Sequence, residues 1–150
     1  MATRSVPAEA CASYDEVGAS EPRVAKLPHP MRCLLALSRL PTGTMRHVRD
    51  AVWLLSRLIV YGSEVLQKHG QPISVAMPTL EQFTGLTRRR IINVRRMLEH
   101  VGLISLSRGV NDKHLTAYVV KGDALCQCLA DTSVGPALVL SMHQHWCRAS

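Results

Sequence analysis

Aromatic residues and long apolar runs are both scarce in this chain of 150 residues. Phe, Trp and Tyr make up only 4% of the sequence, so a core must be built mainly from Leu, Val, Ile and Ala. Such a core suits a mainly helical domain better than a β-sandwich, because aromatic and β-branched residues favour strands. The longest apolar run, 51–60, is broken by Ser56 and Arg57 and is too short to span a bilayer. The sequence therefore predicts a soluble protein with no membrane partner.

The cysteines lack the pattern of a disulfide framework or of a structural zinc site. There are five of them, and an odd, unevenly spaced set with no signal peptide ahead of it predicts a reducing, cytoplasmic location. The C-terminal segment does contain five residues of metal-binding types, which are Cys126, Cys128, His143, His145 and Cys147. Their spacing is unsuitable, because side chains two residues apart on a helix point about 200° apart. We expect no metal, with Cys126 or Cys128 packed as small apolar residues and a loose histidine-bearing end.

Patterns typical of an active site are also missing. The chain shows no nucleophile–base arrangement, no paired carboxylates and no phosphate-binding glycine loop, so we expect neither an enzyme nor a cofactor. Charge is the informative property instead. The net charge is +7, and residues 79–121 contribute +5 of it, through eight Lys and Arg residues against three acids. A local basic cluster of this kind favours an anionic partner, with nucleic acid the first candidate.

The coarse organisation is a flexible N-terminal tail (1–27), a domain (28–122), and a C-terminal helix and tail (123–150) that is a possible dimer contact. The fold class we predict is mainly α (α+β). Apolar periodicity and turn residues predict helices and one β-hairpin, and a short alternating run at 73–78 is compatible with a further strand. The helices are expected at 31–40, 45–69, 79–85, 88–101 and 123–131, and the hairpin at 103–121. The long helix 45–69 carries two adjacent apolar rows, so it is either central to the domain or shared with a second subunit.

The segment 88–101 separates its charges from its apolar residues when it is drawn as a helix. One side carries Ile91, Val94, Leu98 and Val101, with Met97 at its edge. The opposite side carries Arg89, Ile92, Asn93 and Arg96, flanked by Arg88 and Arg95. Clustered arginines repel one another, and Glu99 is the only acid on this helix.

A DNA duplex explains that exposed side better than local pairing does. An α-helix fits the major groove, where Arg binds guanine edges, Asn binds adenine, and an apolar group contacts a thymine methyl. Arg89, Asn93 and Ile92 supply these three chemistries on one face. The plainer interpretation is a solvated basic helix with no ligand. A capped short helix and a tight turn before it, and a basic hairpin after it, favour the DNA interpretation.

The segment 85–104 resembles the winged helix-turn-helix regulators of the GntR and MarR type. Their recognition segment commonly reads G-[LIV]-S-R-x-T-[LIV] and ends in L-E-x-x-G-L-[IV]. The matching residues, without a gap, are Gly85, Leu86, Thr87, Arg88 and Ile91, then Leu98, Glu99, Gly102, Leu103 and Ile104. The resemblance covers about residues 45–121 and includes PTLEQFTG as the first helix of the motif. Two positions depart from the pattern: Arg95 stands where an aliphatic residue is common, and Ile92 where a polar one is common.

This resemblance implies a winged helix-turn-helix fold with a long N-terminal helix and a two-stranded hairpin as the wing. It implies that Thr87, Arg88, Arg89 and Arg90 lie at the DNA-facing end of the recognition helix. In the wing, Arg108, Lys113 and His114 are candidates for phosphate or minor-groove contacts, or form an ordinary charged turn. The implied partner is double-stranded DNA, bound as a homodimer, with a nucleoid-associated location.

Three functions remain open at this level. The first is a transcriptional regulator. The second is a plasmid or phage replication or partition protein, since replication initiators use the same module. The third is a winged-helix protein-interaction module whose basic helix binds an acidic partner.

Overall fold

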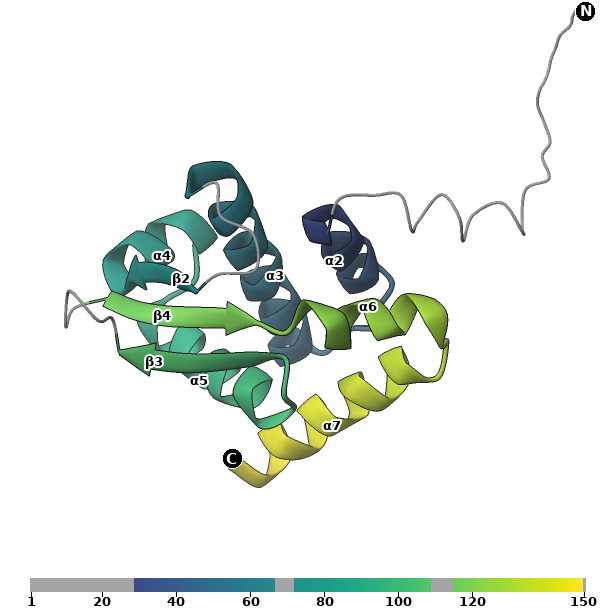
Figure 1. Ribbon diagram of the computed structural model, residues 1–150. Coiled ribbons are helices and arrows are strands. Elements are labelled where there is room, and N and C mark those ends of the chain that lie inside the picture. Colours follow the sequence, from purple (N-terminus) through teal and green to yellow (C-terminus); the bar gives the residue numbers. More distant parts are fainter. Residues whose placement is uncertain (1–28, 67–71, 109–114, 150) are drawn as a thin grey trace, which may run out of the picture.

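The computed structural model describes residues 29–66, 72–108 and 115–149, and it is mainly helical (Figure 1). The predicted N-terminal tail 1–27 lies outside these residues. Six α-helices and one small sheet make up this part of the chain, and no described helix has the length and apolar character of a membrane span. In chain order the elements are α2 (His29–Ser38), α3 (Arg46–Val60) with a π-helical turn at Tyr61–Val65, β2 (Ile73–Ala76), α4 (Met77–Thr84), α5 (Arg88–His100), β3 (Ile104–Arg108), β4 (Leu115–Val120), α6 (Gly122–Ala130) and α7 (Val134–Ala149).

The sheet has three antiparallel strands rather than the two of the expected hairpin. β3 and β4 form the hairpin, and β2 pairs with the other edge of β4, so the strand order is β2-β4-β3. Tyr118 on β4 lies opposite Ile73 on one side and Leu106 on the other. The expectation of a two-stranded sheet is wrong because the alternating run at 73–76, forty residues before β4, supplies a third strand. Its inward residues Ile73 and Val75 are buried, and pairing with β4 satisfies its backbone.

α3 is the central helix of the domain. Most residues of its two apolar rows pack inside the same chain, because α3 contacts α5, α2, α7 and α4. Six of its residues are buried, namely Val48, Ala51, Leu54, Leu55, Leu58 and Ile59. Of the two interpretations of the double row, the central position agrees with this packing. The α-helix ends at Val60, where the π-helical turn begins, instead of continuing regularly to 69.

The C-terminal segment is a helix packed on the domain, not a loose end. α7 contacts α5 and α3, and Val139 and Met142 belong to the same buried core as the residues of α3. The aromatic side chains of α7 also pack. The ring of His47, on α3, lies against the rings of His143 and Trp146, with ring centroids 5.2 and 4.9 Å away. A proline at the third position of α7 is compatible with a helix start, because the first turn needs no backbone N–H from it. Residues 134–149 of the C-terminal segment therefore share the core of residues 29–66.

Candidate nucleic-acid interface

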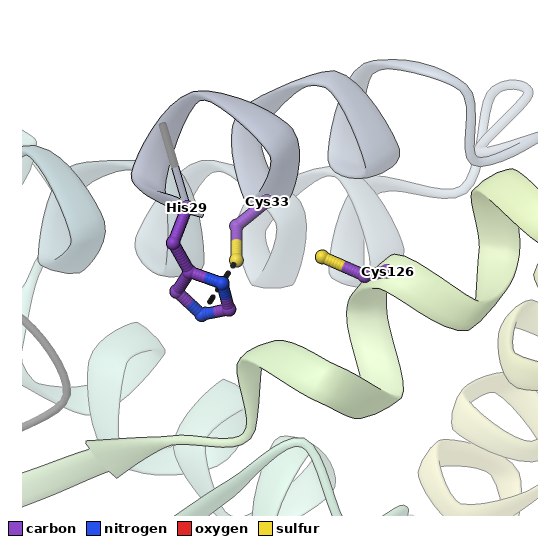
Figure 2. Close-up of side chains that lie close together, drawn as sticks. All are labelled: His29, Cys33 and Cys126. Carbon is purple, nitrogen blue, oxygen red and sulfur yellow. Dashed lines mark hydrogen bonds between the residues drawn. The ribbon is translucent and has the colours of Figure 1, made fainter. Parts of the chain in front are cut away.

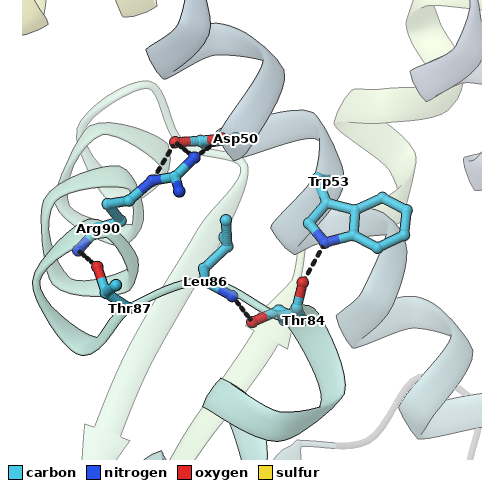
Figure 3. Close-up of polar contacts among 6 residues, drawn as sticks. All are labelled: Asp50, Trp53, Thr84, Leu86, Thr87 and Arg90. Carbon is cyan, nitrogen blue, oxygen red and sulfur yellow. Dashed lines mark hydrogen bonds and ion pairs between the residues drawn. The ribbon is translucent and has the colours of Figure 1, made fainter.

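Two short helices, α4 and α5, are joined by a tight turn at residues 85–87. Gly85 ends α4 in the left-handed region (φ 75°), a conformation that costs a residue with a Cβ about 1–2 kcal/mol. Thr84 is buried and keeps its hydroxyl satisfied by donating to the Leu80 carbonyl at 2.7 Å and accepting from the Leu86 N–H at 3.1 Å (Figure 3). Leu86 is buried beneath the turn. Side-chain and backbone bonds together therefore define the angle between the two helices.

α3 holds this pair of helices through polar contacts with the end of α4. The Trp53 indole N–H donates to the Thr84 carbonyl at 2.6 Å, and the Arg57 Nε donates to the Phe83 carbonyl at 3.2 Å. The Arg57 guanidinium also lies 4.0 Å from the centre of the Phe83 ring. These contacts satisfy carbonyls that a helix C-terminus leaves without an intrahelical partner. The end of α4 is therefore fixed to the central helix rather than only to its own turn.

The start of α5 is fixed by two of the residues expected at its DNA-facing end. Thr87 caps the helix, since its hydroxyl accepts from the Arg90 backbone N–H at 3.3 Å. The Arg90 guanidinium binds the Asp50 carboxylate of α3 at 2.7, 2.8 and 3.0 Å (Figure 3). Charge-assisted forked contacts of this kind fix geometry as well as adding stability. Arg90 and the Thr87 hydroxyl therefore have structural partners already, and their role here is to position α5.

Three other arginines of the predicted reading face have no ion-pair partner within the described part of the chain. Arg88, Arg89 and Arg96 are exposed, and no carboxylate among the described residues lies within ion-pair distance of any of them. Ile92 and Asn93 lie between them and are half-buried. The opposite side of α5 is buried, as the helical spacing predicted, through Ile91, Val94, Met97 and Leu98. The helix is thus anchored by an apolar side and displays guanidinium groups on the other.

Arg95 explains one departure from the recognition pattern. Its guanidinium donates to the hydroxyl of Tyr118 at 3.0 Å. Tyr118 is only 1% exposed and lies on the central strand β4, so its hydroxyl would otherwise be buried without this donor. A long polar side chain at this position therefore connects α5 to the sheet, where an aliphatic residue would only fill space.

The hairpin is described only in part. Arg108 is exposed at the end of β3, in the position expected of a wing residue. Lys113 and His114, the other two candidates, lie outside the described residues. The structure therefore places one of the three predicted wing cations on the surface.

Sequence reasoning missed basic residues on α3. Arg46 and Arg49 are exposed and line a cleft of about 650 Å³ together with Asp50, Trp53 and Arg90. They were overlooked because they precede the basic segment by about forty residues, and only the packing of α3 against α5 adds them to it. The available signal was their spacing, since Arg46, Arg49 and Trp53 recur at the helical interval on the side opposite the buried rows. The cationic surface is therefore wider than α5 alone.

The five C-terminal metal-ligand candidates do not form one group. Cys147 lies 3.6 Å from His143 on the same helix, and His145 stacks on His100 instead. Cys126 lies beside Cys33 of α2. The pKa of the Cys33 thiol is raised to about 12, mainly by burial and also by the neighbouring Cys126. Cys128 packs on the core as expected.

Comparison of the chain with protein-family models, with curated proteins and with solved structures found no match. The resemblance to winged helix-turn-helix regulators therefore depends on the residues of the sequence alone.

Proposed function

We propose that this protein binds double-stranded DNA with sequence specificity, most simply as a transcriptional regulator. In this proposal α5 enters the major groove, and the β3–β4 hairpin serves as the wing of a winged helix-turn-helix. The observation that carries it is a set of three exposed arginines, Arg88, Arg89 and Arg96, on a helix whose other side is anchored in the core. None of the three has an ion-pair partner among the residues that the structure describes. Unpaired guanidinium groups this close together repel one another, and duplex DNA supplies the matching negative charge.

The roles of the individual residues follow from their exposure and chemistry. Arg89 and Asn93 are the candidates for base contacts, since Arg and Asn recognise guanine and adenine edges through paired hydrogen bonds. Ile92 is the candidate for a thymine methyl. Arg88 and Arg96 flank this face and suit phosphate contacts, which orient a protein on the duplex without reading sequence. Arg108 would contact phosphate or the minor groove from the wing.

Two cations outside the motif widen the phosphate-binding surface. Arg46 and Arg49 line the cleft beside Arg90, next to the start of α5. With Arg88, Arg89 and Arg96 they make five exposed arginines on α3 and α5 in each copy of the chain. If three to five of them in each copy neutralise phosphates, the slope of log K against log salt is about −3 to −4.5 for one bound copy and about twice that for a bound dimer.

A homodimer belongs to the same proposal. One module contacts only a few base pairs, so a two-fold dimer reading a palindrome is the usual route to useful specificity. The described surface retains exposed Leu140 on α7 as one apolar position available to a second copy.

The experiment is selection of bound duplexes from a random pool at low salt, followed by footprinting of the enriched site. The account predicts enrichment of one motif by the unaltered chain, with the salt slope given above. The comparison variant, in which Ala replaces Arg88, Arg89 and Arg96 together, should enrich no duplex.

The pattern of the enriched site also separates the remaining functions. A palindrome indicates a regulator operator, whereas tandem repeats indicate a replication or partition site. Failure of the unaltered chain to retain any duplex at low salt would overturn the proposal and favour an acidic protein partner.

A further inference from the structure

Two cysteines and one histidine meet where α2 packs against α6, far from the arginines of α5. His29 and Cys33 are four residues apart on α2, so they lie on one side of that helix. Cys126 reaches them from α6, ninety-three residues later in the chain. Figure 2 shows the three side chains directed toward one another, with the His29 Nε2 3.7 Å from the Cys33 Sγ. All three ligand atoms lie within 4.8 Å of one another.

The spacing of these atoms is close to that of a zinc site. Bonds of about 2.3 Å to sulfur and about 2.0–2.1 Å to nitrogen, at tetrahedral angles, place sulfur and nitrogen ligands about 3.6 Å apart. The His29–Cys33 separation already matches this value. The remaining pairs need to close by about 1 Å or less, which a change of side-chain rotamer provides.

A glycine keeps this space open. Gly122 is the first residue of α6 and is buried. A Cβ built on it would collide with the Nε2 of His29 and would lie 2.8 Å from its Cε1 and 3.2 Å from the Cys33 Sγ. Any other residue would push the imidazole and the thiol out of their present positions. The close approach of α6 to α2 at this point therefore depends on the missing side chain.

The three candidate ligands differ in how far their side chains are exposed to solvent. Cys33 is 2% exposed, Cys126 is half-buried and His29 is exposed. The two sulfur atoms would therefore bind a cation on its buried side, and its other side would face water. Water on that side supplies the fourth ligand and the path by which the ion enters.

We propose that His29, Cys33 and Cys126 bind one thiophilic divalent cation of the Zn²⁺ class, with water in the fourth position. Two thiolates and an imidazole suit zinc and its substitutes, whereas magnesium and calcium require oxygen ligands. The bound ion would join α2 to α6 and so secure the first described helix to the C-terminal pair. The proposal is independent of DNA binding, since none of the three residues lies on α3, α4, α5 or the hairpin. The plain alternative is that the cysteines only pack as small apolar side chains.

The test is a titration of the full chain, chelator-treated and kept reduced, with Co²⁺ followed by Zn²⁺. The expected result is a thiolate-to-cobalt charge-transfer band and the visible bands of tetrahedral cobalt, saturating at one ion per chain and bleached by Zn²⁺. Cys126→Ser should abolish the charge-transfer bands or weaken them strongly. The matched Cys128→Ser variant, two residues away, should leave them unchanged.

Two further variants keep the test decisive if the cysteine variant folds poorly. His29→Ala changes an exposed side chain, so it should leave the circular dichroism spectrum unchanged while weakening the cobalt bands. Cys147→Ser alters the other neighbouring His–Cys pair, with His143, and should leave them intact. The proposal is overturned if no thiolate-to-cobalt band forms, or if the band persists unchanged in both Cys126→Ser and His29→Ala.

Discussion

The ion pair between Asp50 and Arg90 gives the sharpest prediction about how α5 is positioned. The Arg90 Nη2 lies 2.7 and 2.8 Å from the two carboxylate oxygens, and its Nε lies 3.0 Å from one of them. The Asp50 side chain is 15% exposed and the Arg90 side chain 34%, so water screens the pair only in part. Exposed pairs contribute about 0–1 kcal/mol, and breaking a fully buried pair costs about 3–5 kcal/mol. This pair lies between those limits.

We therefore expect Asp50→Asn to lower the free energy of unfolding by about 2 kcal/mol, the value typical of hydrogen bonds to a charged group. For a domain of this size that corresponds to a decrease in Tm of about 6–10 °C. The loss has a second cause, because Arg46 and Arg49 line the same cleft and would then lie beside Arg90 without a neighbouring carboxylate.

The assay is urea and thermal denaturation followed by circular dichroism, arranged as a double-mutant cycle with Arg90→Met. A coupling energy of about 1–2 kcal/mol between the two sites is expected. Arg89→Met is the matched control, because this neighbouring arginine is exposed and has no ion pair with any described residue, and it should change stability by no more than about 0.5 kcal/mol. A coupling energy near zero, or equal losses for Arg89→Met and Arg90→Met, would refute the positioning role.

Three other predictions concern the turn, the core and α7. Gly85→Ala should cost about 1–2 kcal/mol in urea denaturation, because φ is 75° while no atom within 4 Å blocks an added Cβ; a neutral or stabilising effect would contradict the assigned backbone conformation. Leu98→Ala should cost about 2–5 kcal/mol and the adjacent Glu99→Ala less than about 0.5 kcal/mol, so similar losses would show that the buried side of α5 is misassigned. The pKa values of His47 and His145 are both lowered from 6.5, and burial is the largest cause for each. The second cause is the neighbouring charge of His143 for His47 and that of His100 for His145. Near and below pH 6.5 the unfolded chain therefore binds more protons than the folded chain, so Tm should fall as the pH drops below about 6.5. The fall should be less steep in His47→Gln. An unchanged dependence of Tm on pH in that variant would exclude His47 as the cause.

Locally encoded features were predictable from the sequence. α5 was placed to within one residue because Thr87 caps its start, Gly102 follows its end, and its apolar residues recur at helical spacing. The separation of exposed Arg89 and Arg96 from the buried stripe followed from the same periodicity. None of these inferences needed knowledge of a distant contact.

Features that depend on distant contacts were not predictable in the same way. Alternation marked 73–78 as a possible strand, but pairing with β4 is a property of the fold. α7 was taken for a loose end because its burial depends on surfaces of α3 and α5 that exist only after folding. Likewise Arg90 was grouped with the DNA-facing arginines, since Asp50, its partner, lies forty residues earlier.

The grouping of His29 and Cys33 with Cys126 shows the same limit. The closely spaced cysteines and histidines near the C-terminus belong to one segment, whereas the three ligand atoms of this group come from α2 and α6, which are far apart in the sequence. Spacing along a sequence finds metal sites only when neighbouring residues supply most of the ligands.

The most direct measurement of the central claim is the affinity of single arginine variants for the selected duplex, determined by fluorescence anisotropy on the full set of single-base-pair substitutions. Arg89→Ala should weaken binding about 5- to 150-fold, equivalent to about 1–3 kcal/mol, and should relax discrimination at one base-pair position. Arg39→Ala, which removes an equally exposed charge after α2, should weaken binding only slightly and evenly across all sequences. Equal effects of the two variants, with no position losing its specificity, would contradict the assignment of α5 as the helix that reads DNA.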